Sequence, residues 1–236
     1  MILFYQPDIT NKEGLLSPEE SLHCVKVLRK QVGDHIFVTN GKGELFDAEI
    51  TKADKRKCLF KVTNRTEKEK TWNGKIAIAI APTKNLDRIE WFTEKSVEIG
   101  VDEISFLLCH HSERKHFKLD RIEKKAISAM KQSLKFEKPK LNDLTKFKEF
   151  ITTLSSEYDE RFIAYVDRKN PHTLKASHVS GKNACVLIGP EGDFSTDEVD
   201  LAINAGFKKI SLGSSRLRTE TAGIVACHTL QLLNEA

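Results

Sequence analysis

Apolar and polar residues alternate with the period of β-strands over much of the first 70 positions. Two such runs, 36–38 and 44–50, flank an Asn40-Gly41 dipeptide, and this combination is a strong signal for a β-hairpin. A third run follows at 58–62. Several short strands within so few residues predict a small β-barrel in the N-terminal part of the chain.

One helix is expected to interrupt these strands. Ser17 stands at the N-cap, Pro18 at the first helical position and Glu20 three residues after the cap, which is the arrangement of a capping box. The helix is expected to run through Arg29 and to stop before Gly33.

Strands alternate with helices in the rest of the chain. The apolar run at 75–81 is typical of a strand that is buried on both faces, and a helix is expected at 86–99, closed by Gly100. Further strands are expected at 103–108, 162–166, 184–188 and 208–212, and further helices at 119–134, 145–155, 195–205 and 219–234. This alternation predicts an α/β fold with a mostly parallel sheet.

A polar and charged stretch, 64–74, separates the two patterns, and we interpret it as a linker. The chain has 236 residues and a mass of 26.8 kDa, which suits either one large domain or two small ones. We expect one domain at residues 1–70 and a second at residues 71–236.

The composition is that of a globular protein, with 39% hydrophobic and 31% charged residues, and it excludes wholesale disorder and collagen. No run approaches 18 apolar residues and no secretory signal opens the chain, so we expect no membrane span and a cytoplasmic location. The five cysteines are scattered, which favours reduced thiols over disulfides. No second cluster completes a site around Cys109-His110-His111, so no metal is expected.

The positive charge is concentrated in one segment. The formal net charge is only +4, but residues 109–150 hold 12 Lys and Arg against 6 Asp and Glu. A local basic field of this kind attracts polyanions, of which nucleic acid is the commonest. The alternative is a lysine-rich helix surface that is simply solvated.

Open α/β sheets bind ligands at the carboxyl ends of their strands, so we expect the chemistry in the turns after 184–188 and 208–212. The first turn contains Gly189 and Gly192, which let the backbone approach a ligand closely. Neither turn has a dinucleotide fingerprint or a P-loop. Taken singly, each is more typical of an ordinary strand-to-helix connection.

The two turns together resemble the SPOUT superfamily of RNA methyltransferases. Within it, the chain is similar to the bacterial family that methylates N3 of a uracil in small-subunit (16S) ribosomal RNA. The likeness rests on Ile188-Gly189-Pro190-Glu191-Gly192 and on Leu217-Arg218-Thr219-Glu220-Thr221-Ala222 before the last helix. Weaker likenesses are His23–Arg29, Asp87–Glu90, Ser112–Arg114 and Gln132-Ser133.

The chain departs from the family's pattern at four positions. Asp193 stands where a second glycine is usual, and Leu86 stands for the glycine before Asp-Arg. Lys131 replaces a glutamate and Lys135 an arginine, which preserves or increases the positive charge.

The resemblance implies a trefoil-knotted C-terminal domain, a PUA-like N-terminal barrel that binds RNA, a homodimer, and S-adenosylmethionine as the cofactor. It implies 16S ribosomal RNA or the small ribosomal subunit as the partner. Carried over residue by residue, the cofactor-binding positions are Gly189, Pro190, Glu191, Gly192, Leu212, Gly213, Leu217, Arg218 and Thr219.

The implied chemistry is direct methyl transfer to uracil N3, whose anion needs a nearby cation. Arg218 is the first candidate and Arg114 the second, while Glu220 would orient Arg218 or take the proton. An alternative for these residues is helix capping with a local ion pair. RNA contacts are expected from His23, Lys26, Arg29, Lys30, Lys84, Arg114, Lys131 and Lys135. No role is expected for His110, His111, His116 or His172, which we interpret as ordinary loop histidines.

Two other functions stay open on the sequence. One is a SPOUT enzyme that acts on a different RNA target, such as a ribose 2′-hydroxyl of tRNA. The other is a non-catalytic RNA-binding or ribosome-assembly protein, in which Asp193 has spoiled the cofactor loop.

Overall fold

A computed structural model describes residues 1–10, 12–154, 156–166 and 171–235. The chain divides into two compact units. The first comprises Met1–Lys70 and Ile127–Lys138, and the second comprises Thr71–Ala126 and the chain from Pro139 onward. The expected boundary after residue 70 therefore coincides with a unit boundary, but residues 127–138 group with the N-terminal unit.

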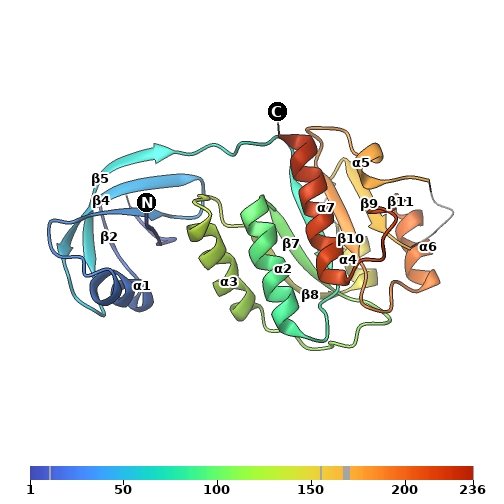
Figure 1. Ribbon diagram of the computed structural model, residues 1–236, viewed down its shortest axis with the longest axis horizontal. Helices are drawn as coiled ribbons and strands as arrows, with labels where there is room; N and C mark the ends of the chain where they lie inside the picture. Colours follow the sequence, from blue (N-terminus) through green and yellow to red (C-terminus); the bar gives the residue numbers. More distant parts are fainter. Residues whose placement is uncertain (11, 155, 167–170, 236) are drawn as a thin grey trace. The chain divides into compact units, whose positions relative to one another are not determined.

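The first unit contains a five-stranded sheet in the order β1-β3-β4-β5-β2, which curls around its own core (Figure 1). Its strands are β1 (Leu3–Tyr5), β2 (Glu13–Leu15), β3 (His35–Thr39), β4 (Glu44–Lys52) and β5 (Leu59–Glu67). The expected hairpin is confirmed, since β3 and β4 pair antiparallel around Asn40-Gly41. Phe4, Phe46 and Phe60 are buried inside the curled sheet.

Strand β5 corrects the expected linker. It continues to Glu67, which pairs with Glu44 of β4, so residues 64–67 belong to the sheet. Their polar side chains do not prevent this, because the pairing with β4 is made by the backbone and none of the four side chains is buried. Strands β1 and β2 were not expected, since three residues are too few to show a period of two.

The expected N-terminal helix is wrong beyond Val27. Helix α1 spans Pro18–Leu22, with Ser17 accepting a hydrogen bond from the Glu20 N–H, and a π-helical turn (η1) follows at His23–Val27. Arg29 then adopts a left-handed backbone with φ of 56°, and Lys30 lies beyond it. The wide turn places Cys24 in the core, where its carbonyl accepts from the Lys30 N–H.

The second unit contains a six-stranded sheet in which every described pair of neighbouring strands is parallel, as expected. The order is β11-β9-β10-β6-β7-β8. The strands are β6 (Ile76–Ile80), β7 (Glu103–Leu108), β8 (Lys140–Lys146), β9 (Glu160–Ala164), β10 (Ala184–Ile188) and β11 (Lys208–Ile210). Its helices are α2 (Leu86–Ile99), α4 (Phe147–Thr153), α5 (Leu174–Ser177), α6 (Thr196–Asn204) and α7 (Thr219–Asn234). Helix α3 (Leu119–Gln132) begins in this unit, but its residues from Ile127 onward group with the first unit.

Most expected elements of this unit are confirmed. The bounds of α2 and α7 agree with the expectation, and the capping box at Ser195 is present. The expected helix at 145–155 begins only at Phe147, and Ser155 lies outside the described residues. Residues 140–146 before it form β8, a strand at the edge of the sheet. Most of its side chains are polar, so the sequence has no apolar run that would predict a strand there.

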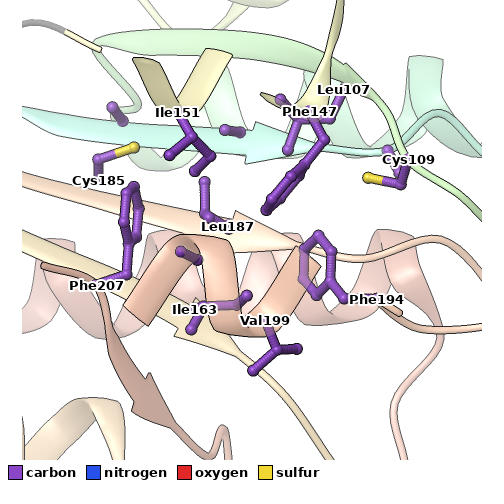
Figure 2. Close-up of a cluster of buried hydrophobic side chains, with 14 of the residues drawn as sticks. Leu107, Cys109, Phe147, Ile151, Ile163, Cys185, Leu187, Phe194, Val199 and Phe207 are labelled. Carbon is purple, nitrogen blue, oxygen red and sulfur yellow. The ribbon is translucent and has the colours of Figure 1, made fainter. Parts of the chain in front are cut away.

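Helices cover both faces of the parallel sheet. Helices α4 and α6 bury Phe147, Ile151 and Val199 against the small side chains of β6, including Ala77 and Ala79 (Figure 2). Helices α2 and α7 lie side by side on the opposite face (Figure 1). The period of two along β6 thus gives alanine to one layer and isoleucine to the other.

A buried carboxylate ties the amino ends of the strands together. Glu103, at the start of β7, accepts hydrogen bonds from Tyr158 at 2.9 Å and Asn142 at 2.7 Å and forms an ion pair with Lys75 at 2.8 Å. Burial by itself raises the pKa of Glu103. The hydrogen bonds and the charge of Lys75 lower the pKa by more than burial raises it, so the pKa lies below its ordinary value of 4.5. This network therefore lies at the amino edge of the sheet.

Replacing Glu103 with glutamine is expected to lower the free energy of unfolding by about 2 kcal/mol at pH 7, since a buried charge-assisted network is broken. Because the pKa of Glu103 is lower in the folded state, its ionised carboxylate stabilises the fold above pH 4.5. This stabilisation is lost as the pH falls through the pKa of the folded state. Urea unfolding should therefore show that the difference from wild type shrinks below pH 4.5. Glu157→Gln, in the exposed member of the same cluster, is the control with little cost. A difference that stays constant as the pH falls from 7 through the acid range contradicts this assignment.

Candidate active site

One cavity of about 350 Å³ opens at the carboxyl edge of the parallel sheet. It brings together the turn after β10 and the turn after β11, as the sequence predicted for a ligand site. Its lining residues are Arg88, Ala164, Val166, Ile188, Gly189, Pro190, Glu191, Asp193, Arg216, Leu217, Arg218, Thr219, Glu220 and Ala222.

The turn after β10, residues 189–193, is closed by its own backbone, and the residue that follows it is buried. The Asp193 N–H donates to the Pro190 carbonyl at 2.9 Å, which closes a tight turn. Phe194 follows and is buried, with its ring centroid 5.4 Å from that of Phe147 (Figure 2). A Cβ on Gly189 would lie 3.2 Å from the Phe194 ring and from Oδ1 of Asp193, so a side chain at this position would be crowded.

Asp193 does not disrupt this turn. Its φ is 62°, in the left-handed region that glycine adopts freely and that aspartate tolerates better than most residues. Its carboxylate accepts from the Phe194 N–H at 2.8 Å, and burial raises the pKa of Asp193. A left-handed conformation that glycine adopts freely is therefore held here by an aspartate that also accepts from the next N–H.

Replacing Asp193 with alanine is expected to lower the free energy of unfolding by about 1–2 kcal/mol, because alanine is strained at this φ and lacks the acceptor. Asp193→Asn keeps both properties, and it removes a charge that burial disfavours, so its stability should stay within about 0.5 kcal/mol of wild type. Urea unfolding at pH 7 measures both variants. Equal losses in the two would show that the backbone conformation is not what matters.

The turn after β11 ends at the N-terminus of α7. Arg218 is the N-cap residue and its carbonyl accepts from the Ala222 N–H, but its side chain makes no capping hydrogen bond. Arg216 and Arg218 are exposed, whereas Thr219 and Glu220 are buried. The positive end of the α7 dipole and two arginines therefore border the cavity.

Arg88 is a cavity residue to which the sequence assigned no role. It lies in the first turn of α2, and its Nε is 3.7 Å from Oε1 of Glu220. Among the described residues, Oε2 of Glu220 is buried without a hydrogen-bond partner. Glu220 thus pairs with Arg88 and not with Arg218, the partner that the sequence suggested. The one sequence signal for Arg88 was its position within residues 87–90, which resemble the family's pattern.

The turn after β9 also contributes, through Ala164 and Val166. The sequence did not point to it, because the order of strands cannot be read from periodicity. The sheet places β9 between β11 and β10, so its carboxyl end lies between the two predicted turns.

The predicted cofactor positions fall into two groups. Gly189, Pro190, Glu191, Leu217, Arg218 and Thr219 line the cavity, as does the predicted catalytic Glu220. Gly192, Leu212 and Gly213 are not among its lining residues. Gly192 packs instead on His111, and the Gly213 N–H donates to Ser211 at 3.2 Å.

Arg114 lies outside the cavity lining, although it was a catalytic candidate. Its Nε donates to the Thr83 carbonyl at 3.0 Å and its terminal nitrogen donates to the Lys84 carbonyl. The Lys84 ammonium pairs with Glu113 at 3.0 Å, which raises the pKa of Lys84. These two cations therefore make their described contacts within the protein.

The other predicted RNA contacts differ in how far they are exposed. Lys26 and Arg29 are exposed at the surface of the first unit, while His23 is half-buried near Phe4. Since the helix ends at Val27, Arg29 and Lys30 do not share a helical face with Lys26, which corrects that expectation. Partners within the unit already engage other ammonium groups, Lys30 donating to His35 and Lys131 pairing with Glu20 at 2.6 Å. Lys135 is half-buried.

No helix within the described residues has the length and apolar character to span a bilayer. In the same part of the chain, no group of three or more His, Cys, Asp or Glu side chains is placed to hold a metal ion.

Comparisons with known proteins identify the family. An RNA methyltransferase domain model matches residues 70–231, and an RNA methyltransferase PUA domain model matches residues 16–63. The chain is 27% identical to ribosomal RNA small subunit methyltransferase E of Rickettsia conorii, over 94% of this chain and 91% of that protein.

Two solved structures share the fold. A probable rRNA-methyltransferase from Porphyromonas gingivalis is 46% identical with a TM-score of 0.90, over 98% of this chain and 99% of that one. Ribosomal RNA small subunit methyltransferase E from Neisseria gonorrhoeae, bound to S-adenosyl methionine, is 26% identical with a TM-score of 0.86, over 99% of this chain and 98% of that one. Because the methyltransferase model matches more than half of the chain, the protein belongs to the RNA methyltransferase family that carries an N-terminal PUA domain.

Proposed function

We propose that the protein transfers a methyl group from S-adenosylmethionine to N3 of a uridine in 16S ribosomal RNA. The observation that carries this proposal is the single cavity formed by the turns after β10 and β11, with Arg88, Arg216 and Arg218 around it. The similar protein from Neisseria gonorrhoeae, which is bound to S-adenosyl methionine, supports the choice of cofactor.

The residues of the cavity fit this cofactor. Ile188, Leu217 and Ala222 offer apolar surface for an adenine ring, and a volume of about 350 Å³ lies in the range of small-molecule sites. The buried Oε2 of Glu220, which has no hydrogen-bond partner among the described residues, suits a ligand that carries positive charge. Gly189 and Pro190 present backbone at the rim of the same cavity.

When bound, the cofactor supplies an electrophilic methyl group on a positively charged sulfonium. The protein's part is to accept the N3 proton and to stabilise the uracil anion that remains. Oε2 of Glu220, which has no hydrogen-bond partner among the described residues, takes the proton, and Arg218, an exposed cation at the cavity edge, stabilises the anion. The N-terminus of α7 adds to the same field. Glu220 holds Arg88 at the cavity wall through their ion pair.

We propose that the first unit binds the sugar-phosphate backbone of the RNA. Its match to an RNA methyltransferase PUA domain and the exposed side chains of Lys26 and Arg29 support this role. Cations of this kind contact phosphates, and so they position an RNA without reading its sequence.

We also propose a homodimer that forms through α2 and α7. Trp91 of α2 is 46% exposed and Leu232 of α7 is 61% exposed, on two helices that lie side by side. Large exposed apolar side chains on adjacent helices favour association. Light scattering is expected to give twice the chain mass of 26.8 kDa, and a monomeric mass would contradict the dimer.

Methyl transfer itself is the decisive test. The protein is incubated with labelled S-adenosylmethionine and with small ribosomal subunits from a strain that lacks this methylation. Nucleoside analysis of the 16S ribosomal RNA should show label in 3-methyluridine. Label in a ribose methyl group would indicate a different target, and no label despite RNA binding would indicate a non-catalytic protein.

A further inference from the structure

The loop after β7, residues 109–114, contacts two other loops at the carboxyl edge of the sheet. One is the turn after β10, residues 189–193, which lines the cavity. The other is the loop after β6, which contains Thr83 and Lys84. The loop after β7 contributes none of the cavity's lining residues, so its contacts are not explained by binding a ligand directly.

His111 makes the contact to the cavity turn. Its Nδ1 lies 3.0 Å from the Asp193 carbonyl oxygen, and a carbonyl only accepts, so Nδ1 donates. A Cβ on Gly192 would lie 3.0 Å from the Cβ of His111, so the two backbones approach closely here. His111 therefore fixes the turn both by a hydrogen bond and by packing.

The neighbouring residue makes a second attachment. The His110 N–H donates to Oε1 of Glu198 at 2.8 Å. Oε2 of the same carboxylate accepts from the Ser195 N–H at 2.9 Å and so completes the capping box of α6. The Glu198 carboxylate thus connects the start of α6, just after the turn at 189–193, to the loop after β7.

Arg114 attaches the loop after β7 to the loop after β6. Its guanidinium donates to the Thr83 and Lys84 carbonyls, which fixes the loop after β6. The Lys84 N–H in turn donates to Oε1 of Glu191 at 3.1 Å, and Glu191 lines the cavity. The cavity turn is therefore attached at Glu191 through Arg114 and at Asp193 through His111.

We infer that His111 and Arg114 are positioning residues that hold the turn at 189–193 in its ligand-binding shape. Neither is a catalytic residue, because neither lines the cavity. This inference rests on the proposed function of that cavity. A preformed turn lowers the free-energy cost of ordering on binding, so losing either attachment weakens cofactor affinity more than it slows methyl transfer at saturation.

The chemistry of His111 allows a sharp test. Its task requires one N–H at the Nδ1 position, and the neutral ring with its proton there performs it as well as the charged ring. The side-chain NH₂ of asparagine occupies nearly the same place. His111→Asn should therefore restore the contact that His111→Ala removes, whereas a proton-transfer role would be lost in both variants.

The experiment measures His111→Ala, His111→Asn and the control His116→Ala, which alters an exposed histidine of the same segment. Calorimetry gives the dissociation constant of S-adenosylmethionine. Hydrogen exchange in the cofactor-free protein reports the protection of residues 189–195. Methylation assays give kcat, the KM for cofactor and the pH profile.

His111→Ala is expected to weaken cofactor binding roughly five- to tenfold, the effect of about one lost hydrogen bond. It should raise amide exchange at 189–195 and leave kcat at saturating cofactor within about twofold, with an unchanged pH profile. His111→Asn and His116→Ala should stay close to wild type. Arg114→Ala should weaken binding at least as much, with partial rescue by Arg114→Lys.

Each contrary result has a distinct meaning. If wild type binds S-adenosylmethionine and His111→Ala binds equally well, the positioning role is overturned. Loss of kcat in both His111 variants with a changed pH profile would overturn it in favour of proton transfer. If wild type itself does not bind the cofactor, the proposed function fails, while the exchange data still report whether His111 orders the turn.

Discussion

Replacing Arg218 with alanine is expected to lower the rate of methyl transfer at saturating cofactor about 100- to 1,000-fold. Removing a preorganised charge from the place where an anion develops has effects of this size. Arg218 is exposed at the cavity edge, so the variant should keep the thermal stability of wild type. Single-turnover transfer to small ribosomal subunits measures the rate without the contribution of product release.

Two variants test whether Arg218 acts through a specific contact or only as one of several positive charges. Arg218→Lys keeps the charge but loses the planar guanidinium, and an intermediate loss of about tenfold is expected. Arg216→Ala removes an equally exposed arginine from the same cavity wall, and it should cost less than about tenfold. If Arg216→Ala were as damaging as Arg218→Ala, a general positive field would explain the rate better than a specific contact.

Replacing Gly223 with alanine is expected to lower the free energy of unfolding by about 2–3 kcal/mol, although alanine is the better helix former. Gly223 lies in α7 where this helix meets α2, and a Cβ there would be 2.5 Å from Cε2 of Phe92 and 3.1 Å from Cδ1 of Ile80. Overpacking of a dense core has costs of this order, which exceed the propensity gain of about 1 kcal/mol. Urea unfolding measures the loss.

The same pair of helices supplies the first control. Phe92→Leu shortens the opposing side chain, so the double variant Gly223→Ala, Phe92→Leu should be more stable than the sum of the two single effects predicts. Outside this pair of helices, Asp200→Ala, at an exposed position of α6, should be neutral. Additive losses in the double variant would show that close contact with Phe92 is not the reason for glycine at this position.

The sequence predicted most elements of the second unit because their signals are local. The caps at Ser195 and Gly100 and the apolar run of β6 depend only on neighbouring residues, and each was found where expected. Polar or very short segments gave no such signal, which is why β8 and β1 were missed. The first helix was extended too far, since no local pattern marks the π-helical turn that buries Cys24.

The sequence by itself determined where ligand chemistry would lie, because the turns that follow parallel strands share one edge of the sheet. Gly189, Leu217, Arg218 and Glu220 were all found on the cavity wall. Only the tertiary structure placed β9 between β10 and β11, added Arg88 from α2, and turned Arg114 toward backbone carbonyls. Strand order and the pairing of charges depend on contacts between residues far apart in the chain, which periodicity and spacing do not encode.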